Sequence, residues 1–398
     1  MNKNMATPKG TRDILLEECE TQIWLEDKLK DSFVRYGYYP VITPGIEYLD
    51  VYADAPGNAG SEFMLKLINS EGEILVLRPD STAPIARLTA SRLKNSSKPV
   101  RLYYNQRVYR QKEIYSGRRI EISQMGVELI GANSIRADLE MLQLAVEALE
   151  NCGLPEYRIE LGHGGLCELL LSRLGLDDSG KEQLRQWIQA KNYPALSDFL
   201  GAMEQGDEVL AVKALPELFG GREVLDKASS IFHDEESQEI IAYMRALFDV
   251  LQELGLKDKL MLDMGFVNDN DYYTGIIFQD YASGSGEAVL LGGRYDRLLE
   301  RFGEELPAVG FGVNVDLLTK CCMDERRQAG VRAPQVLVWG EAGYEVLSLQ
   351  YASTLRQAPG TIVENGLFDH LEQCKAYAAA RGIGQIHVVG QRITVLSL

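Results

Sequence analysis

The sequence contains no stretch as apolar as a membrane-spanning helix, which needs about eighteen or more consecutive apolar residues. Its first residues, MNKNMATPKGTRD, lack the apolar core of a secretion signal, so we expect a cytoplasmic protein with no membrane contact. Hydrophobic residues make up 45% and charged residues 25% of the chain, as in ordinary globular proteins. Its 398 residues predict two or three domains.

Metal-binding and redox patterns are also missing. The six cysteines include no CxxC pair. Adjacent Cys321 and Cys322 leave a redox role open, but thiols kept reduced in the cytosol are the ordinary interpretation. The histidines are few and far apart, which gives no support to a zinc site or a histidine-based triad: His163, His233, His370 and His387. We therefore expect no metal.

Positive charge is scarce, because the formal net charge is −17 at pH 7. This balance argues against broad nucleic-acid binding, which needs a basic face. One local cluster of basic residues nonetheless stands out: Arg101, Arg107, Arg110, Lys112, Arg118 and Arg119. In an acidic protein such a cluster indicates a localised anion site or a face that a partner completes; a solvated pair of charged strands is the alternative.

The first part of the chain mixes helical and strand-like segments. Apolar residues at helical spacing predict helices over 17–36 and from Asp138 onward. β-Branched and aromatic residues predict strands over 98–110 and 118–131, and the loop between them has the length that joins two antiparallel strands. A further predicted strand, 73–80, runs into a polar loop.

Two later regions differ in character. Residues 164–260 are rich in leucine and charged residues between turns, which predicts a helical insertion. Strand signals return at 272–281 and 308–315, so the insertion interrupts a single core over 1–320. Beyond a polar linker, strands and helices alternate through 333–398, which predicts a small C-terminal α/β domain with a largely parallel sheet.

Polar residues lie on an otherwise apolar face of strand 118–131. Strand alternation puts Gln124 and Glu128 on the face that carries isoleucines, with Gly126 between them. A buried polar pair costs free energy unless it has a partner, and glycine leaves space for a ligand close to the backbone. The pattern predicts a site for a small polar molecule whose ammonium or ring N–H the carboxylate accepts; a solvent-exposed face is the alternative.

Two other segments are weaker signals. The loop LRPDSTAPIAR (77–87) places Asp80, Ser81 and Thr82 between a strand and a helix, where they also form an ordinary N-cap motif. The glycines of GSGEAVLLGGRYDRL (284–298) lack the spacing of a Walker or dinucleotide loop. This argues against nucleotide binding by either route.

Together, several segments resemble histidyl-tRNA synthetase and its relatives. The opening segment of that family is similar to TPKGTRDILLEE, and the loop that holds the substrate amino group is similar to LRPDSTAPIAR. The class II motif 2 hairpin resembles RLYYNQRVYRQKEIYSGRRIEISQMGVELIG, the histidine-specific strands resemble DYYTGIIFQDY with GGRYDRL, and motif 3 resembles AVGFGVNVDLL. The resemblance covers about 1–320. It implies an α+β fold, with a class II aminoacyl-tRNA synthetase-like six-stranded antiparallel sheet flanked by helices, in a homodimer.

The resemblance also implies a histidine pocket. Asp80 stands where the family has a glutamate, and the other positions match the family's substrate-binding residues. The implied pocket consists of Asp80, Thr82, Arg110, Gln124, Glu128, Tyr272 and Tyr273. Such a set suits free histidine, with carboxylates for its ammonium, an arginine for its carboxylate and tyrosine hydroxyls for its ring nitrogens.

Catalysis, by the same resemblance, is lost. A working synthetase of this family carries an arginine where this chain has Asn268, and an ATP-gripping motif 3 arginine where it has Leu317. A motif 2 glutamate is replaced by Lys112. Because positioned arginines stabilise the charge that develops on phosphates, we expect no catalytic residues and no activation of histidine.

A kept amino-acid pocket beside a lost ATP site resembles the regulatory subunit of ATP phosphoribosyltransferase, a synthetase paralogue. The segment ILVLRPDSTAPIAR is typical of that family. The resemblance implies a non-catalytic subunit that short-form ATP phosphoribosyltransferase needs for activity and for histidine feedback control, at the first step of L-histidine biosynthesis. It implies L-histidine and the short catalytic subunit as partners, a homodimer within a hetero-octamer, no cofactor and no tRNA.

Two alternatives stay open. An active but diverged histidyl-tRNA synthetase is suggested by Arg110 and the complete amino-acid pocket. An RNA-binding paralogue is suggested by the basic hairpin. The tail 333–398 resembles a reduced anticodon-binding domain, and its role is left open.

Overall fold

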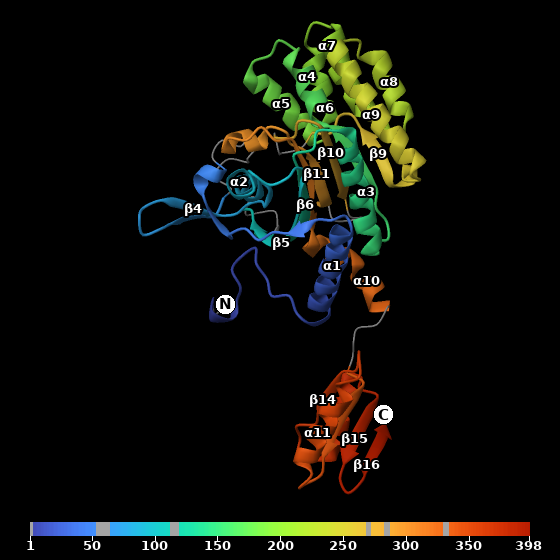
Figure 1. The fold of residues 1–398 in the computed structure, drawn as a ribbon. Helices are drawn as coiled ribbons and strands as arrows, with labels where there is room; N and C mark the ends of the chain where they lie inside the picture. Colours follow the sequence, from blue (N-terminus) through green and yellow to red (C-terminus); the bar gives the residue numbers. More distant parts are fainter. Residues whose placement is uncertain (1–2, 53–63, 112–118, 268–271, 282–286, 329–333) are drawn as a thin grey trace. The chain divides into compact units, whose positions relative to one another are not determined.

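Two compact units make up the chain, Met1–Asp324 and Glu325–Leu398. The computed structural model describes residues 3–52, 64–111, 119–267, 272–281, 287–328 and 334–398 (Figure 1). Each unit contains its own β-sheet, and the larger unit carries a second, small one.

The larger unit is built on a sheet whose described strands follow the order β1-β5-β6-β12-β11-β10-β7-β9-β8. The six strands from β5 to β7 in this order all pair antiparallel, as the class II resemblance implies. Strands β1 and β9 pair in parallel with the two ends of this antiparallel core. The bounds are β1 Tyr39–Pro40, β5 Val100–Tyr109, β6 Glu121–Ile130, β7 Ile159–His163, β8 Phe219–Gly220, β9 Leu260–Asp263, β10 Ile276–Tyr281, β11 Ala288–Arg294 and β12 Ala308–Asn314.

Side chains of β6 alternate between the two faces of this sheet. Met125 and Val127 are buried in the main hydrophobic cluster, together with the apolar stripes of helices α1 (Leu16–Arg35) and α3 (Ile135–Asn151). Glu128 and the residues in step with it point to the opposite face. Because one face of β6 is buried in the hydrophobic cluster, the side chains on its opposite face are fixed as well.

Six α-helices lie between β7 and β9 and gather at one end of the sheet, green to yellow in Figure 1. They share the main hydrophobic cluster with the sheet, since Leu184 of α5 and Leu247 of α9 are buried in the cluster that includes Ile276 of β10. The bounds are α4 Gly164–Ser172, α5 Asp178–Gln189, α6 Tyr193–Gly201, α7 Asp207–Ala214, α8 Glu223–Ile231 and α9 Glu235–Glu253.

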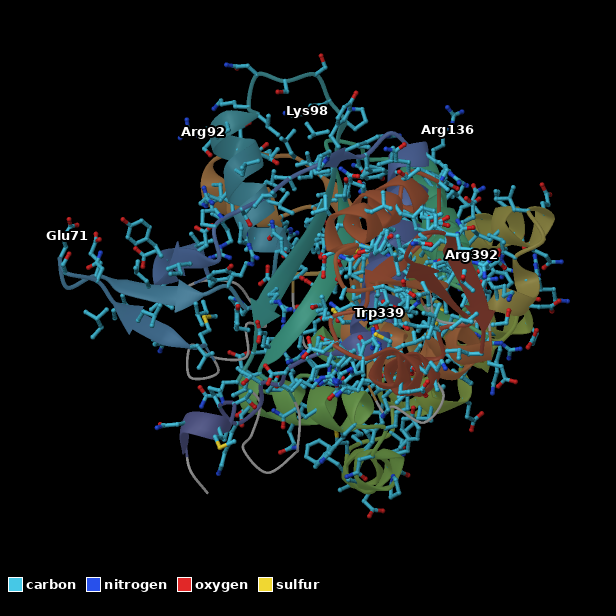
Figure 2. All side chains as sticks on the ribbon, turned by 90° about the horizontal axis from the view of Figure 1, so that it is seen from below. Glu71, Arg92, Lys98, Arg136, Trp339 and Arg392 are labelled. Carbon is cyan, nitrogen blue, oxygen red and sulfur yellow. The ribbon has the colours of Figure 1, made fainter. Side chains whose placement is uncertain are left out.

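A small antiparallel sheet projects from the other side of the unit, in the order β2-β4-β3. Glu71 lies in the turn at the tip of its β3–β4 hairpin (Figure 2). The sequence predicted β4 alone of these strands, as part of the longer segment 73–80. The remaining helices and strands of the unit are β2 Ile46–Tyr48, β3 Lys66–Ile68, β4 Ile74–Leu77, α2 Thr82–Arg92, α10 Val315–Gln328 and the 3-10 helices η1 Lys3–Met5, η2 Leu49–Val51, η4 Leu215–Glu217, η5 Lys257–Lys259 and η6 Leu298–Phe302.

The C-terminal unit has a four-stranded sheet in the order β14-β13-β15-β16. Strands β14, β13 and β15 are parallel, in agreement with the predicted strand–helix alternation. The sequence did not predict β16, which pairs antiparallel with β15. The bounds are β13 Val336–Gly340, α11 Glu345–Leu355, β14 Val363–Asn365, α12 Leu371–Arg381, β15 Gln385–Val389 and β16 Ile393–Ser397.

Candidate functional site

A cavity of about 480 Å³ lies on the face of the main sheet that carries Glu128. All seven residues of the implied pocket line it: Asp80, Thr82, Arg110, Gln124, Glu128, Tyr272 and Tyr273. They come from the loop before α2, the start of α2, the end of β5, the middle of β6 and the segment before β10. The fold thus brings together segments that are almost two hundred residues apart in the sequence.

Glycines of β12 make room for the polar side chains of β6. Gly310 lies opposite Glu128, and a Cβ atom on it would be 2.0 Å from the Oε2 atom of that glutamate. Likewise, a Cβ atom on Gly312 would be 2.9 Å from the Nε2 atom of Gln124. A larger residue at Gly310 would meet both this carboxylate and, at 2.4 Å, the carbonyl oxygen of Val127, so the site and the sheet both require the glycine.

Gly126 serves a different purpose from the one that its position in the sequence indicated. We expected it to leave space for a ligand, but Tyr104 of β5 lies directly opposite and fills that space. A Cβ atom on Gly126 would be 2.5 Å from the Tyr104 hydroxyl. This hydroxyl donates to the Oε1 atom of Gln124 at 3.3 Å, so the glycine positions a tyrosine that orients the amide.

Glu128 is the buried carboxylate of the cavity, with only 2% of its surface exposed. Its Oε1 atom accepts a hydrogen bond from Thr82 Oγ1 at 2.8 Å, and its Oε2 atom accepts one from the hydroxyl of Tyr295. Burial raises the pKa of Glu128 to about 8, although both hydrogen bonds favour the charged form. The alternative of a solvent-exposed face is therefore wrong at this residue.

Asp80 combines the two interpretations that the sequence left open. Its Oδ1 atom accepts the backbone N–H of Ala83 at 2.9 Å, in the first turn of α2. Residue Asp80 also lines the cavity, where burial raises the pKa of its carboxyl group. Asp80 also raises the pKa of Glu128, since two nearby carboxylates repel each other, and a cationic ligand group would relieve this repulsion by interacting with both.

Arg110 is fixed at the edge of the cavity. Its Nε atom donates to the carbonyl oxygen of Pro79 at 2.7 Å. Of the other described members of the predicted basic cluster, Arg119 also lines the cavity, whereas Arg101 and Arg107 do not, and each of the three pairs with a carboxylate. The pairs are Arg101–Glu140 at 2.7 Å, Arg107–Glu121 at 3.1 Å and Arg119–Asp316 at 2.7 Å, while Lys112 and Arg118 lie outside the described residues.

Three tyrosine rings meet at one wall of the cavity. The ring centroids of Tyr272 and Tyr273 are 4.8 Å apart, and those of Tyr272 and Tyr295 are 5.8 Å apart at nearly a right angle. Tyr295 and Tyr104 belong to the cavity but are not among the residues predicted from the sequence. Each follows a recognisable signal, since Tyr295 ends the run GGRY and Tyr104 faces a glycine across the β5–β6 hairpin.

The start of α10 lies where the resemblance places the end of motif 3. Leu317 is partly buried and packs against the main hydrophobic cluster. Its neighbour Asp316 accepts the backbone N–H of Ser123 at 2.8 Å and pairs with Arg119. The other two positions of the expected ATP-site loss, Asn268 and Lys112, lie outside the described residues.

The described residues offer neither a cluster of metal ligands nor a membrane-spanning helix. Among the described residues, no group of three or more His, Cys, Asp or Glu side chains is placed to hold a metal ion. Within the same part of the chain, no helix has the length and apolar character needed to cross a membrane.

Comparison with known proteins identifies the family of this chain. The family model described as histidyl-tRNA synthetase matches residues 10–318. A relative from Clostridium kluyveri named ATP phosphoribosyltransferase regulatory subunit is 36% identical over 380 residues, which cover 94% of this chain and 97% of the relative.

Solved structures agree with this comparison. An ATP phosphoribosyltransferase regulatory subunit/histidyl-tRNA synthetase from Bacillus halodurans is similar with a TM-score of 0.83 and 30% identity, over 94% of this chain and 96% of that one. A histidyl-tRNA synthetase from Nostoc sp. PCC 7120 shares the fold, with a TM-score of 0.78 and 20% identity over 99% and 97% of the two chains. The chain therefore belongs to the histidyl-tRNA synthetase family and, within it, to the ATP phosphoribosyltransferase regulatory subunits.

Proposed function

We propose that this chain is the non-catalytic regulatory subunit of a short-form ATP phosphoribosyltransferase, and that L-histidine is its regulatory ligand. The observation that carries the proposal is the cavity lined by all seven residues of the implied pocket. Relatives that match nearly the whole chain are named as regulatory subunits of that enzyme. The subunit acts in histidine biosynthesis by conveying the level of the end product to a separate catalytic chain.

The chemistry of the cavity matches free histidine. Asp80 and Glu128 offer carboxylates to a ligand that carries an ammonium group and a ring N–H. Arg110, held by its Nε atom, has its terminal nitrogens available to bind a carboxylate in the two-pronged geometry that arginine favours. The hydroxyls of Tyr272 and Tyr273 are suited to the ring nitrogens.

The residues at the start of α10 are poorly equipped to bind phosphates. Leu317 is an apolar side chain packed against the hydrophobic cluster, at the position where the resemblance places an ATP-gripping arginine. Asp316 engages Arg119, which reduces the positive charge that this arginine offers to a nucleotide. Adenylation needs positioned cations to stabilise charge that develops on phosphates. These features support a subunit that binds histidine without activating it.

Regulation requires that histidine bind two arrangements of the subunit with different affinity. The segment around 265–275 is the candidate element, because it carries both tyrosines that close on the ligand. Through it, histidine shifts the equilibrium of the assembled enzyme, and by reciprocity the catalytic partner shifts histidine affinity. We propose a homodimer of this chain within a hetero-octamer, without tRNA and without a cofactor.

A reconstitution experiment tests this function. The full chain is co-purified with the short catalytic subunit, and phosphoribosyl transfer is measured with and without histidine. We expect the mixture to be active, each chain alone to be inactive or nearly so, and millimolar histidine to inhibit. A mixture that stays inert contradicts the activator role. An active mixture that histidine does not inhibit contradicts the sensor role. Glu128→Gln tests the same role at the pocket, because inhibition by histidine should weaken in this variant.

The second candidate is an active histidyl-tRNA synthetase. It is favoured by the retained Arg110 and by the fold shared with synthetase structures. Histidine-dependent exchange of pyrophosphate into ATP separates the two functions, because only a chain that activates histidine supports it. We expect no exchange above background. Robust exchange by the purified chain would overturn the regulatory assignment.

A further inference from the structure

A buried ion pair joins the edge of the ligand cavity to helix α3. Asp138 is fully buried in the first turn of α3, and Arg294, the last residue of β11, is 94% buried. The Nε atom of Arg294 donates to Asp138 Oδ1 at 2.9 Å, and its Nη2 atom donates to the same oxygen at 2.5 Å. The Nη1 atom donates to the Ala132 carbonyl and to Asp296, both at 3.1 Å. Every nitrogen of the guanidinium group is therefore engaged.

Helix α9 of the insertion reaches this ion pair through one side chain. The hydroxyl of Tyr243 donates to the Oδ2 atom of Asp138. The Tyr243 ring stands edge-on to the ring of His163, with centroids 6.5 Å apart, so its position is set by packing as well. Asp138 thus accepts from Arg294 on both oxygens, more closely on Oδ1 than on Oδ2, where the Nε atom lies at 3.3 Å, and from the insertion on Oδ2.

On the other side, Arg294 is connected to the cavity by two short routes. The next residue, Tyr295, donates its hydroxyl to Glu128. The carbonyl oxygen of Arg294 accepts the N–H of Thr274 at 2.8 Å, one residue beyond Tyr273. The N–H of Asp296 in turn donates to Thr274 Oγ1 at 3.0 Å. The placement of Arg294 therefore affects both the buried carboxylate and the tyrosine wall.

Fold stability alone gives no reason to keep such a pair. Burying two charges costs free energy of desolvation, and well-packed apolar residues of similar volume often serve stability equally well. A hydrogen-bonded ion pair does fix geometry, because the N–H groups of the planar guanidinium point in fixed directions. Here the fixed geometry is that of the strand end that carries Tyr295.

We propose that Tyr243, Asp138 and Arg294 are positioning residues of the ligand cavity, through which helix α9 of the insertion sets the positions of Tyr295 and Thr274. Ligand affinity then depends on a hydroxyl that lies outside the cavity, on a helix that lines no part of it. The inference rests on the proposed function only in taking histidine as the ligand. The connection itself is made of contacts within the chain.

Tyr243→Phe removes the hydroxyl and keeps the ring. We expect the dissociation constant for histidine, measured by calorimetry on the full chain, to rise about three- to tenfold. The matched control is Tyr157→Phe, which removes another hydroxyl bond, to the carbonyl oxygen of Val146 at 3.4 Å, and should leave the constant unchanged. Tyr157 is itself 91% buried. A Tyr243→Phe variant that binds histidine as tightly as the wild type overturns the proposal.

A double-mutant cycle separates positioning from general destabilisation. Tyr243→Phe and Tyr295→Phe are measured singly and together. Each variant raises the dissociation constant for histidine by some factor. If Tyr243 acts through the placement of Tyr295, the factor for the double variant should be at least threefold smaller than the product of the two single factors. A factor equal to that product means that the two residues act independently, and it overturns the connection.

Hydrogen exchange of the backbone gives a readout that needs no ligand. The amides of Thr274 and Asp296 report on the connection directly, since their acceptors are the Arg294 carbonyl and the Thr274 hydroxyl. We expect both to exchange several-fold faster in Tyr243→Phe and at the wild-type rate in Tyr157→Phe. Equal rates in the two variants overturn the proposal. Wild-type protein that fails to bind histidine would instead overturn the proposed function, and exchange would still decide the connection.

Discussion

Glu128→Gln should change the response of the protein to pH, because it removes a buried carboxyl group whose pKa is strongly raised. The pKa of Glu128 is raised from 4.5 to about 8. Burial is the main cause, and the nearby carboxylate of Asp80 adds to it, while hydrogen bonds from Tyr295 and Thr82 oppose it. At about 1.4 kcal/mol per pKa unit, ionising Glu128 in the ligand-free cavity costs roughly 5 kcal/mol more than ionising an exposed glutamate.

This shift makes stability fall as pH rises. In unfolded protein the group loses its proton near its ordinary pKa of 4.5, whereas in folded protein with an empty cavity it keeps the proton up to about pH 8. The folded state therefore binds more protons than the unfolded state between these values. The stabilisation from Glu128 is complete below about pH 4.5 and is lost as pH rises through about 8. Glu128→Gln should remove this slope, which denaturant unfolding at pH 5, 6.5 and 8 measures.

Histidine binding should reverse the preference of Glu128 for its protonated form. A cationic or N–H group beside Glu128 stabilises the carboxylate, so binding expels the proton. At pH 7, one unit below a pKa of about 8, about nine-tenths of the empty cavities hold that proton, and binding should release about one proton per site. Calorimetry in two buffers of different ionisation enthalpy counts the protons. Glu128→Gln keeps an oxygen that accepts a hydrogen bond but should release about one proton fewer. Equal release by both proteins would refute this account of Glu128.

Three further predictions concern the rest of the cavity. Arg110→Lys, which replaces a planar fork by a single ammonium, should weaken histidine binding about tenfold but leave binding of histamine, which lacks the carboxylate, almost unchanged in titrations. Gly310→Ala should abolish histidine binding, since its methyl group would lie 2.0 Å from the Glu128 carboxylate, whereas Gly45→Ala, with no atom within 4 Å, should bind normally in the same calorimetric assay. Histidine at a hundredfold excess over its dissociation constant should raise the free energy of unfolding by about 2.7 kcal/mol, and an unchanged thermal midpoint would contradict binding to the native state.

Sequence pattern alone predicted the parts of the cavity that lie along one strand. The alternation of β6 placed Gln124 and Glu128 on a shared face, because side chains of a strand alternate whatever surrounds it. Tyr104 and Tyr295 escaped prediction because their roles depend on contacts between strands. Tyr104 reaches Gln124 only because the β5–β6 register sets it opposite Gly126, and a shift by one residue would turn it to the other face.

Short strands and the partners of ion pairs could not be predicted from the sequence either. All three residues of β3 are exposed, so this strand has no apolar alternation by which it could be recognised. The basic residues around the motif 2 hairpin looked like one cluster in the sequence. In the fold, Arg101 and Arg107 pair with carboxylates on different elements, Glu140 and Glu121. Proximity in sequence on a long strand is not proximity of side-chain ends.

The proposed loss of ATP handling beside a kept amino-acid pocket is possible in this fold because the two depend on different atoms. The carboxylate of Asp316 accepts the backbone N–H of Ser123 and so holds β6 beside α10, next to Gln124. The adjacent side chain, Leu317, takes no part in that bond and packs into the hydrophobic cluster instead. Under the proposed function, leucine where the resemblance places an arginine removes a charge from the nucleotide side and leaves the framework of the proposed histidine pocket in place. Under the proposed function, a regulatory subunit arises from a synthetase fold by this separation, because feedback control needs the pocket and has no use for the phosphates.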